Sequence, residues 1–263
     1  MGCNMSNAPG ITAANDAAPA SAVYPSLAGK RVVVTGGGSG IGAGLVEAFA
    51  RQGAETIFID ILESESASLV STLGGKIKFH KVDLTDLGAI EAFFKSLGPI
   101  DVLVNNAGND DRHELKDITP AYWDERMAVN LRHMLFAAKA VAPGMKSRGG
   151  GAIINLGSIS WHLGLPGLLL YETAKAAIEG MTRALARELG GDNIRVTTVV
   201  PGNVKTPRQM KWYTPEGEAE IVNAQCLKDR VLPAHVASLV LFLASDDGRM
   251  CTGHEYWIDA GWA

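Results

Sequence analysis

After Lys30, the pattern of apolar residues alternates between short runs and longer segments. Short runs rich in β-branched and other apolar residues are separated by longer segments with helical periodicity. Most of the short runs are almost continuously apolar, which is typical of strands covered on both faces. The pattern predicts strands at residues 31–36, 56–60, 76–82, 101–106, 152–157, 194–200 and 255–259. It predicts helices at residues 40–52, 64–73, 86–97, 120–147, 171–189 and 233–244.

This alternation of strands and helices predicts the fold class. We expect a single α/β domain with a Rossmann-type, doubly wound, mostly parallel seven-stranded sheet and helices on both faces. The domain should span residues 26–263, after a flexible N-terminal extension at residues 1–25 that is rich in Ala, Asn, Ser and Pro. The opening MGCNMS matches an N-myristoylation pattern, but so short a pattern recurs by chance.

Composition excludes several classes of partner. The chain has a formal net charge of −4 and no basic stripe interleaved with aromatic residues, which argues against a nucleic-acid partner. No apolar run approaches the roughly 18 to 20 residues that a membrane helix needs. Cys3, Cys226 and Cys251 are scattered without metal-binding spacing, which indicates reduced thiols and no metal site. We therefore expect a cytoplasmic protein with a small, neutral or polar ligand.

A glycine-rich turn, TGGGSGIG (35–42), joins the first predicted strand to the first predicted helix. Its spacing is Gly36-x-x-x-Gly40-x-Gly42, which differs from the common G-x-G-x-x-G pattern. The physical requirements are the same: a tight turn, a backbone close to a pyrophosphate, and helix amides directed at the anion. Alone, such a turn is a weak signal; between an apolar strand and an amphipathic helix it predicts a dinucleotide site.

The nature of the dinucleotide is predicted by Asp60, which ends the second strand eighteen residues after Gly42. A carboxylate at this spacing binds the adenine ribose hydroxyls and would repel a 2′-phosphate. Residues 36–44 contain no Lys or Arg, and Ile61 follows Asp60, so no cation is available to neutralise that phosphate. The sequence favours NAD over NADP, although a capping or surface role for Asp60 is an alternative.

Tyr171 and Lys175 lie four residues apart on a predicted helix and therefore share a face. A nearby ammonium, joined by an oxidised nicotinamide ring, favours the phenolate and lowers the pKa of the tyrosine. Ser158 ends the fifth strand, where its hydroxyl could hold a substrate oxygen. Asn130 lies in mid-helix, where asparagine is unfavourable, so it has either a specific polar task or a satisfied buried amide.

These motifs together resemble the short-chain dehydrogenase/reductase family. The resemblance covers residues 27–263 and includes the glycine turn, NNAG (105–108), YETAK (171–175) and PGNVKT (201–206). It implies that Tyr171 is the general acid/base, that Lys175 lowers its pKa and holds the nicotinamide ribose, that Ser158 orients the substrate, and that Asn130 supports a water-linked proton path. The cofactor-binding residues that it implies are Gly36, Ser39, Gly40, Ile41, Gly42, Asp60, Ile61, Asp83, Leu84, Asn105, Asn106, Ala107, Gly108, Tyr171, Lys175, Pro201, Gly202, Val204 and Thr206.

Four longer segments are similar to the NAD-dependent members of this family that oxidise D-xylose at its anomeric carbon to a lactone. They are NNAGNDDRH (105–113), GSISWHLGL (157–165), RQMKWYTPEGEAEIV (208–222) and CTGHEYWIDAGW (251–262). The polar and aromatic segment 206–226 also suits a polyhydroxylated ligand. The expected substrate contacts are Ser158, Tyr171, Asn109, His162, Asn203, Trp212 and Tyr213.

Two other functions stay open at this point. One is an NAD(P)-dependent short-chain reductase of another polar carbonyl or polyol, and the other is a cofactor-sensing regulator without catalysis. The joint presence of Asn130, Ser158, Tyr171 and Lys175 favours an enzyme, because a regulator has no need of all four. The resemblance further implies a homotetramer with the helices at 120–147 and 171–189 in its interface.

Overall fold

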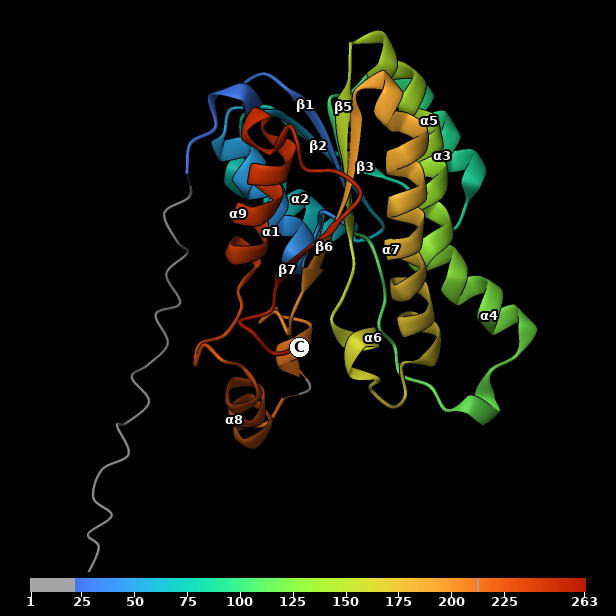
Figure 1. Cartoon of the computed structure of the whole chain (residues 1–263), viewed down its shortest axis with the longest axis vertical. Coiled ribbons are helices and arrows are strands. Elements are labelled where there is room, and N and C mark those ends of the chain that lie inside the picture. The colour runs from blue at the N-terminus through green and yellow to red at the C-terminus, as the bar shows by residue number, and fades with distance from the viewer. Residues whose placement is uncertain (1–21, 212) are drawn as a thin grey trace, which may run out of the picture.

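Seven strands form one sheet in the computed structural model, which describes residues 22–211 and 213–263 (Figure 1). The spatial order is β3-β2-β1-β4-β5-β6-β7, and every ladder in it is parallel. The predicted fold class is confirmed. The N-terminal extension lies outside the described residues up to position 21. The strands are β1 (Arg31–Thr35), β2 (Glu55–Asp60), β3 (Ile77–Lys81), β4 (Val102–Asn105), β5 (Gly151–Leu156), β6 (Ile194–Pro201) and β7 (Glu255–Ile258).

Helices cover both faces of this sheet. One layer contains α1 (Gly40–Arg51), α2 (Glu63–Leu73) and α9 (Pro233–Ala244), and the other contains α3 (Leu87–Leu97), α5 (His133–Ser147) and α7 (Leu169–Leu189) (Figure 1). Within β1, Val32 and Val34 join the core under the first layer, whereas Val33 joins the core under the second. The almost continuous apolar runs in the sequence exist because alternate residues enter two separate cores.

The predicted helix at 120–147 is confirmed in its bounds, but it widens into a π-helical turn near its middle. It consists of α4 (Pro120–Met127), a π-helical turn η3 (Ala128–Arg132) and α5. Asn130 lies in the π turn with its side chain fully buried, where Oδ1 accepts from the backbone N–H of Asn109 at 2.7 Å and Nδ2 donates to the carbonyl of Arg126 at 3.1 Å. Widened turns of this kind occur often at functional sites. The cost expected for an asparagine in mid-helix is thus offset by two buried hydrogen bonds.

Two α-helices were not predicted from the sequence. The first is α6 (Ser160–Leu163), and the second is α8 (Pro215–Ala224), which Thr214 caps by accepting from the N–H of Gly217 at 3.2 Å. The apolar pattern missed α8 because Ile221 is its one buried residue. The 3₁₀ turns are η1 (Pro25–Leu27), η2 (Leu115–Asp117), η4 (Gly190–Asp192), η5 (Gln209–Lys211) and η6 (Asp246–Gly248).

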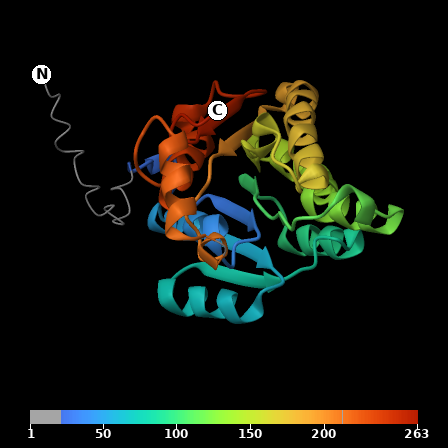
Figure 2. The same ribbon diagram turned by 90° about the horizontal axis from the view of Figure 1, so that it is seen from below.

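Residues 205–230, called the flap below, form an excursion between β6 and α9. Its base is closed by a parallel bridge between Val204 and Val231 and by the Lys205 N–H, which donates to the Val231 carbonyl at 2.8 Å. The flap carries α8 beyond the carboxyl ends of the strands, as the two perpendicular views show (Figures 1 and 2). The flap therefore adjoins the edge of the sheet where ligands of doubly wound folds bind.

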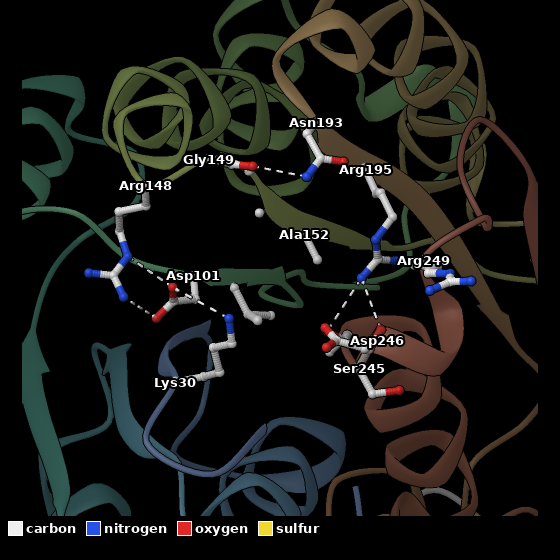
Figure 3. A pocket seen from close by; sticks show the side chains of 14 residues that line it. Lys30, Asp101, Arg148, Gly149, Ala152, Asn193, Arg195, Ser245, Asp246 and Arg249 are labelled. Carbon is white, nitrogen blue, oxygen red and sulfur yellow. Dashed lines mark hydrogen bonds and ion pairs between the residues drawn. The ribbon is translucent and has the colours of Figure 1, made fainter. Parts of the chain in front are cut away.

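A polar cavity of about 190 Å³ lies at the opposite edge, by the amino ends of β1, β4, β5 and β6 (Figure 3). Two arginines that line it bond to other groups of the protein. Arg148 donates to both carboxylate oxygens of Asp101 at 2.9 and 3.2 Å, and Arg195 donates to four backbone carbonyls at the end of α9 and in the following η6. These contacts tie α5 to β4 and β6 to α9, so the cavity is held together by structural bonds.

Candidate active site

The glycine turn after β1 is packed too closely for side chains. A Cβ at Gly42 would lie 1.8 Å from the carbonyl oxygen of Gly36, and a Cβ at Gly36, whose φ is +64°, would lie 2.8 Å from the Cα of Ala107. Ser39 precedes α1 as its N-cap without a side-chain capping bond, and Ile41 lies in the first turn. The amides of that first turn have no partner within the helix. The turn therefore has no side chains between its backbone and a ligand, and its free amides fit a pyrophosphate; we call this turn the glycine cradle. It lies at the point where the strand order reverses between β1 and β4.

The NNAG segment after β4 fixes the other side of this cradle. Asn106 donates through Nδ2 to the carbonyls of Thr35 and Gly36, both at 3.0 Å, and its backbone N–H donates to the Thr35 hydroxyl at 2.9 Å. Asn105 has a different place, because it is fully buried and donates to Asn155 Oδ1 at 2.9 Å. Asn106 thus shapes the cradle, whereas Asn105 joins β4 to β5.

Asp60 lies beside the glycine turn, and backbone amides surround its carboxylate. Oδ2 accepts from the Gly38 N–H at 2.8 Å, and Oδ1 accepts from the two following amides at 2.7 and 3.0 Å. Asp60 is buried and does not cap α2, so it is neither the surface nor the capping residue of the alternative interpretation. Its bonds to backbone amides are compatible with a role at the ribose, which stays a prediction, since a carboxylate can accept further bonds. Ile61 next to it is 60% exposed, while Leu84, after β3, is buried beside an exposed Asp83.

The end of β6 supplies the remaining predicted cofactor residues. Pro201 is buried as the last residue of β6, and Gly202 follows with its N–H bonded to the carbonyl of Ile258 at 3.0 Å. Thr206 lies opposite the glycine turn, since a Cβ at Gly40 would be 3.4 Å from its methyl carbon. The root of the flap and the glycine turn therefore lie against each other at the carboxyl edge of the sheet.

Four predicted catalytic residues converge around Gly108. A Cβ at Gly108 would lie 3.2 Å from Asn130 Oδ1 and 3.7 Å from Lys175 Nζ. Lys175 is 2% exposed, and its Nζ donates to the last carbonyl of β5 at 2.7 Å and lies 5.3 Å from the ring centroid of Tyr171. Ser158 follows β5; its Oγ accepts from the backbone N–H of Ser160 at 3.1 Å, and its side chain lowers the pKa of Tyr171. The structure thus brings together side chains that are up to 45 residues apart in the sequence.

The polypeptide by itself does not favour a phenolate at Tyr171. Burial raises its pKa, the carboxylate of Asp110 raises it further, and the hydrogen bond with Ser158 and the charge of Arg208 act in the opposite direction. Burial also lowers the pKa of Lys175 to about 8, against the attraction of Asp110. The predicted lowering of the Tyr171 pKa by Lys175 is not found in the chain alone, because Lys175 is not among the groups that shift this pKa. A phenolate at Tyr171 therefore needs a further positive charge beside it.

His133 is a buried group near Lys175 that the sequence analysis missed. Burial lowers the pKa of its imidazole to about 4, and the neighbouring Lys175 acts in the same direction. The ring is accordingly neutral at physiological pH, and it adds no charge to the site.

Several predicted substrate contacts are bonded within the protein. Asn109 bonds through Oδ1 to Arg208 Nη2 at 3.0 Å, and Asn203 donates to the hydroxyl of Tyr213 at 2.6 Å, which in turn donates to Gln209 Oε1 at 2.9 Å. These residues hold the flap and its root at the carboxyl edge of the sheet. Trp212 lies outside the described residues.

His162, another predicted substrate contact, belongs to a cluster with two tryptophans and a carboxylate. Its Nε2 lies 3.1 Å from Glu179 Oε1, and its ring centroid is 3.7 Å from that of Trp161 and 4.3 Å from that of Trp257. Glu179 also accepts from Trp161 Nε1 at 2.9 Å. The imidazole thus links α6 to α7 and β7 through contacts within the protein, and its contact with substrate stays a prediction.

Asp110 and Arg126 are two further residues of the site that were not predicted. The charge of Asp110 acts on both Tyr171 and Lys175. Arg126 is 3% exposed, donates to the carbonyl of Asn109, and lies 3.6 Å from Asp111. The signal for Asp110 was present as paired aspartates directly after NNAG, whereas a buried arginine one turn before Asn130 had no recognisable pattern.

Two kinds of feature are absent from the part of the chain that the structure describes. None of its helices is long and apolar enough to cross a bilayer. No group of three or more His, Cys, Asp or Glu side chains among these residues is placed to hold a metal ion.

The fold, the glycine cradle and the tyrosine–lysine pair define a nicotinamide-dependent oxidoreductase. The profile of a family described as enoyl-(acyl carrier protein) reductase matches residues 36–263. A solved structure titled "short chain dehydrogenase/reductase family protein" has a TM-score of 0.83 at 32% identity and covers 90% of this chain and 98% of its own. The chain belongs to the short-chain dehydrogenase/reductase family.

Two relatives resemble the chain over almost all of their length. A Caulobacter vibrioides protein named "D-xylose 1-dehydrogenase" is 71% identical over 245 residues, which are 92% of this chain and 99% of the relative. A Rhizobium meliloti protein named "Probable galactose dehydrogenase GalD" is 44% identical over 250 residues, or 92% and 98% of the two chains. The names of both relatives describe sugar dehydrogenases.

Proposed function

We propose that this chain is an NAD-dependent aldose 1-dehydrogenase that oxidises D-xylose at its anomeric hydroxyl to the lactone. The observation that carries the proposal is the 71% identity to the Caulobacter relative over nearly the full length of both chains. The convergence of Asn130, Ser158, Tyr171 and Lys175 around Gly108 supports an active enzyme over a sensor. The fold alone would favour neither an active enzyme nor a sensor, since one fold hosts many functions.

The proposed reaction moves one proton and one hydride. Tyr171, as phenolate, takes the proton of the anomeric hydroxyl while Ser158 holds the same oxygen. When bound, the oxidised nicotinamide accepts the C1 hydrogen with its electron pair, and its positive charge favours the phenolate. The C1–O bond then becomes a carbonyl, and the ring oxygen shares the positive charge that develops at C1. Lys175 holds the nicotinamide ribose, and the proton leaves along the path that Asn130 supports.

A panel of substrates tests this proposal. The purified protein with NAD should oxidise D-xylose faster than simple alcohols, steroids or hydroxyacyl thioesters, and related aldoses more slowly than D-xylose. A rise in NADH absorbance measures oxidation of the substrate, and a fall in NADH absorbance measures its reduction. Activity confined to ketone or acyl reduction would contradict the sugar assignment and favour the alternative of a short-chain reductase.

The preference for NAD should depend on Asp60. Asp60→Ala removes the charge that opposes a 2′-phosphate, so the ratio of kcat/KM with NAD to that with NADP should fall by roughly ten- to a hundredfold, the effect of one close repulsion in a partly solvated site. The Gly38 amide also loses its partner, so both cofactors should bind more weakly. A matched control is Asp124→Ala, which removes an exposed carboxylate from α4 and should leave the ratio unchanged. An unchanged ratio in Asp60→Ala would leave Asp60 with the structural role alone.

The proposed homotetramer has a candidate contact surface on α5 and α7. An apolar groove of about 610 Å³ runs between these helices, and Leu135 on its rim is 43% exposed. Leu135→Glu should shift the sedimentation coefficient towards a smaller assembly, because it buries a charge in the contact. Leu115→Glu changes an exposed leucine elsewhere and should have no such effect. Equal sedimentation of both variants and the wild type would place the interface on another surface.

A further inference from the structure

The polar cavity at the amino edge of the sheet, which we call the basic cavity, carries more positive than negative charge (Figure 3). Its charged lining consists of two carboxylates, Asp101 and Asp246, and four basic side chains, those of Lys30, Arg148, Arg195 and Arg249. Positive charge is therefore in excess by two. The cavity lies at the ends of the strands opposite to the glycine cradle, so it is separate from the candidate active site.

On one side of the basic cavity, a single carboxylate faces two cations. Asp101 is 7% exposed and accepts from Arg148 at 2.9 and 3.2 Å, and the Nζ of Lys30 lies 4.0 Å from its Oδ1. The side chains of Lys30 and Arg148 are 43% and 47% exposed, so a ligand in the cavity can reach both of them. Asp101 thus fixes these two cations in place without neutralising both.

The cations on the other side of the basic cavity have no carboxylate partner. Arg195 and Arg249 lie across the cavity from Lys30 and Arg148 (Figure 3). Arg195 donates to backbone carbonyls alone, which orient its guanidinium without removing its charge. Within residues 22–211 and 213–263, the side chain of Arg249 forms no hydrogen bond or ion pair, and the exposed carboxylate of Asp246 has no cation within 4.0 Å. This side therefore also attracts an anion.

The size and lining of the basic cavity restrict the kind of anion. None of its described lining residues is aromatic, so no ring is present on which a base could stack. Its volume of about 190 Å³ equals that of about six water molecules at ~30 Å³ each. Part of its wall is the glycine run 149–151, and an added Cβ at Gly149 would meet no atom within 4 Å. Guanidinium groups bind carboxylate and phosphate oxygens through paired N–H donors. The lining thus fits a compact phosphate or carboxylate ligand without an aromatic ring.

We propose that the basic cavity binds a compact anion with at least two negative charges, of the phosphate or carboxylate class. The anion lies between Lys30 and Arg148 on one side and the two other arginines on the opposite side, and it neutralises the excess charge. It thereby links the residues before β1 and after α5 to β6 and to the turn after α9. Binding stabilises the folded chain and needs no part of the proposed reaction at Tyr171.

Thermal melts with pyrophosphate and with citrate test this site. Both anions are compared with sodium chloride at the same ionic strength, in saturating NADH so that the glycine cradle is occupied. The melting temperature should rise above that in chloride, because a ligand that binds only the folded state stabilises it. A rise with pyrophosphate alone assigns the phosphate class, a rise with citrate alone assigns the carboxylate class, and a rise with both shows that charge is sufficient. No rise with either anion overturns the proposal.

Two variants locate the bound anion. Arg249→Met and Lys30→Met each remove one exposed cation, and calorimetry should show that the Kd of the stabilising anion rises by about threefold to tenfold, the effect of one charge in a partly solvated site. Arg249→Glu, which reverses the charge, should raise the Kd further. The matched control is Lys95→Met, which removes the same charge from an exposed position on α3 and should bind as the wild type does.

The outcome for these variants is independent of the proposed function. If NADH does not bind, the proposed dehydrogenase is refuted, but the variants still show where pyrophosphate or citrate binds. An unchanged Kd in both Arg249→Met and Lys30→Met would place the anion outside the basic cavity and overturn the proposal. An equal rise of the Kd in Lys95→Met would also overturn it, because the anion would then respond only to the net charge of the chain.

Discussion

Tyr171→Phe is expected to lose turnover by about 10²- to 10⁴-fold, the range over which a positioned general base accelerates a reaction. The phenylalanine ring can pack in the same place, but no oxygen remains to take the proton of the substrate hydroxyl. Lys175 keeps its bond to the carbonyl that ends β5, so cofactor binding should persist. Calorimetry with NADH and a rate assay, both on one preparation, measure the two properties separately.

The control for this variant is Tyr24→Phe, which removes a phenolic hydroxyl outside the candidate site, next to η1. It should match the wild type in rate and in NADH affinity. Wild-type turnover in Tyr171→Phe would show that another group accepts the proton. Loss of NADH binding together with turnover would mean that the hydroxyl also helps to hold the cofactor.

The sheet could be predicted because its signal is local and repeated. In β1 and β4 each apolar residue enters one of two cores, so the strand appears as an unbroken apolar run bounded by polar residues. The π-helical turn within the helix at 120–147 could not be predicted, because the buried asparagine in this turn is satisfied by a residue that is distant in the sequence. Asn130 bonds to the backbone of Asn109, and local periodicity contains no information on that pairing.

The candidate site was predictable where backbone geometry restricts the residue type. Gly42 has to be glycine because the Gly36 carbonyl occupies the space of a side chain. The polar substrate contacts were less predictable, because an Asn or a His in a loop can bond to ligand or protein. His162 pairs with Glu179, and Asp110 pairs with Arg208, a residue that is distant in the sequence.

The second large effect that we expect is a loss of NADH affinity in Gly42→Ala, because Gly42 lies close to Gly36. In Gly42→Ala the methyl group would lie 1.8 Å from the Gly36 carbonyl oxygen, roughly half of an ordinary carbon–oxygen contact distance. The opposing atom belongs to the backbone and cannot rotate away, so the start of α1 has to move relative to β1. The amides of that helical turn would then miss the pyrophosphate. We expect NADH affinity to fall by more than about a hundredfold, and the free energy of unfolding to fall by about 1–3 kcal/mol, as for other overpacked positions.

Gly191→Ala provides the matched control for Gly42→Ala. Gly191 lies in η4, where an added Cβ would meet no atom within 4 Å, so the substitution should leave NADH affinity unchanged. Fluorescence titration with NADH and thermal melts with and without the cofactor distinguish the two variants. The wild type and Gly191→Ala should gain thermal stability from NADH, whereas Gly42→Ala should stay folded at room temperature and gain almost none, because a ligand stabilises only the state that binds it. Equal NADH affinity in Gly42→Ala and the wild type would show that the cofactor does not lie on this turn, and the dinucleotide site would have to be sought elsewhere along the carboxyl edge of the sheet.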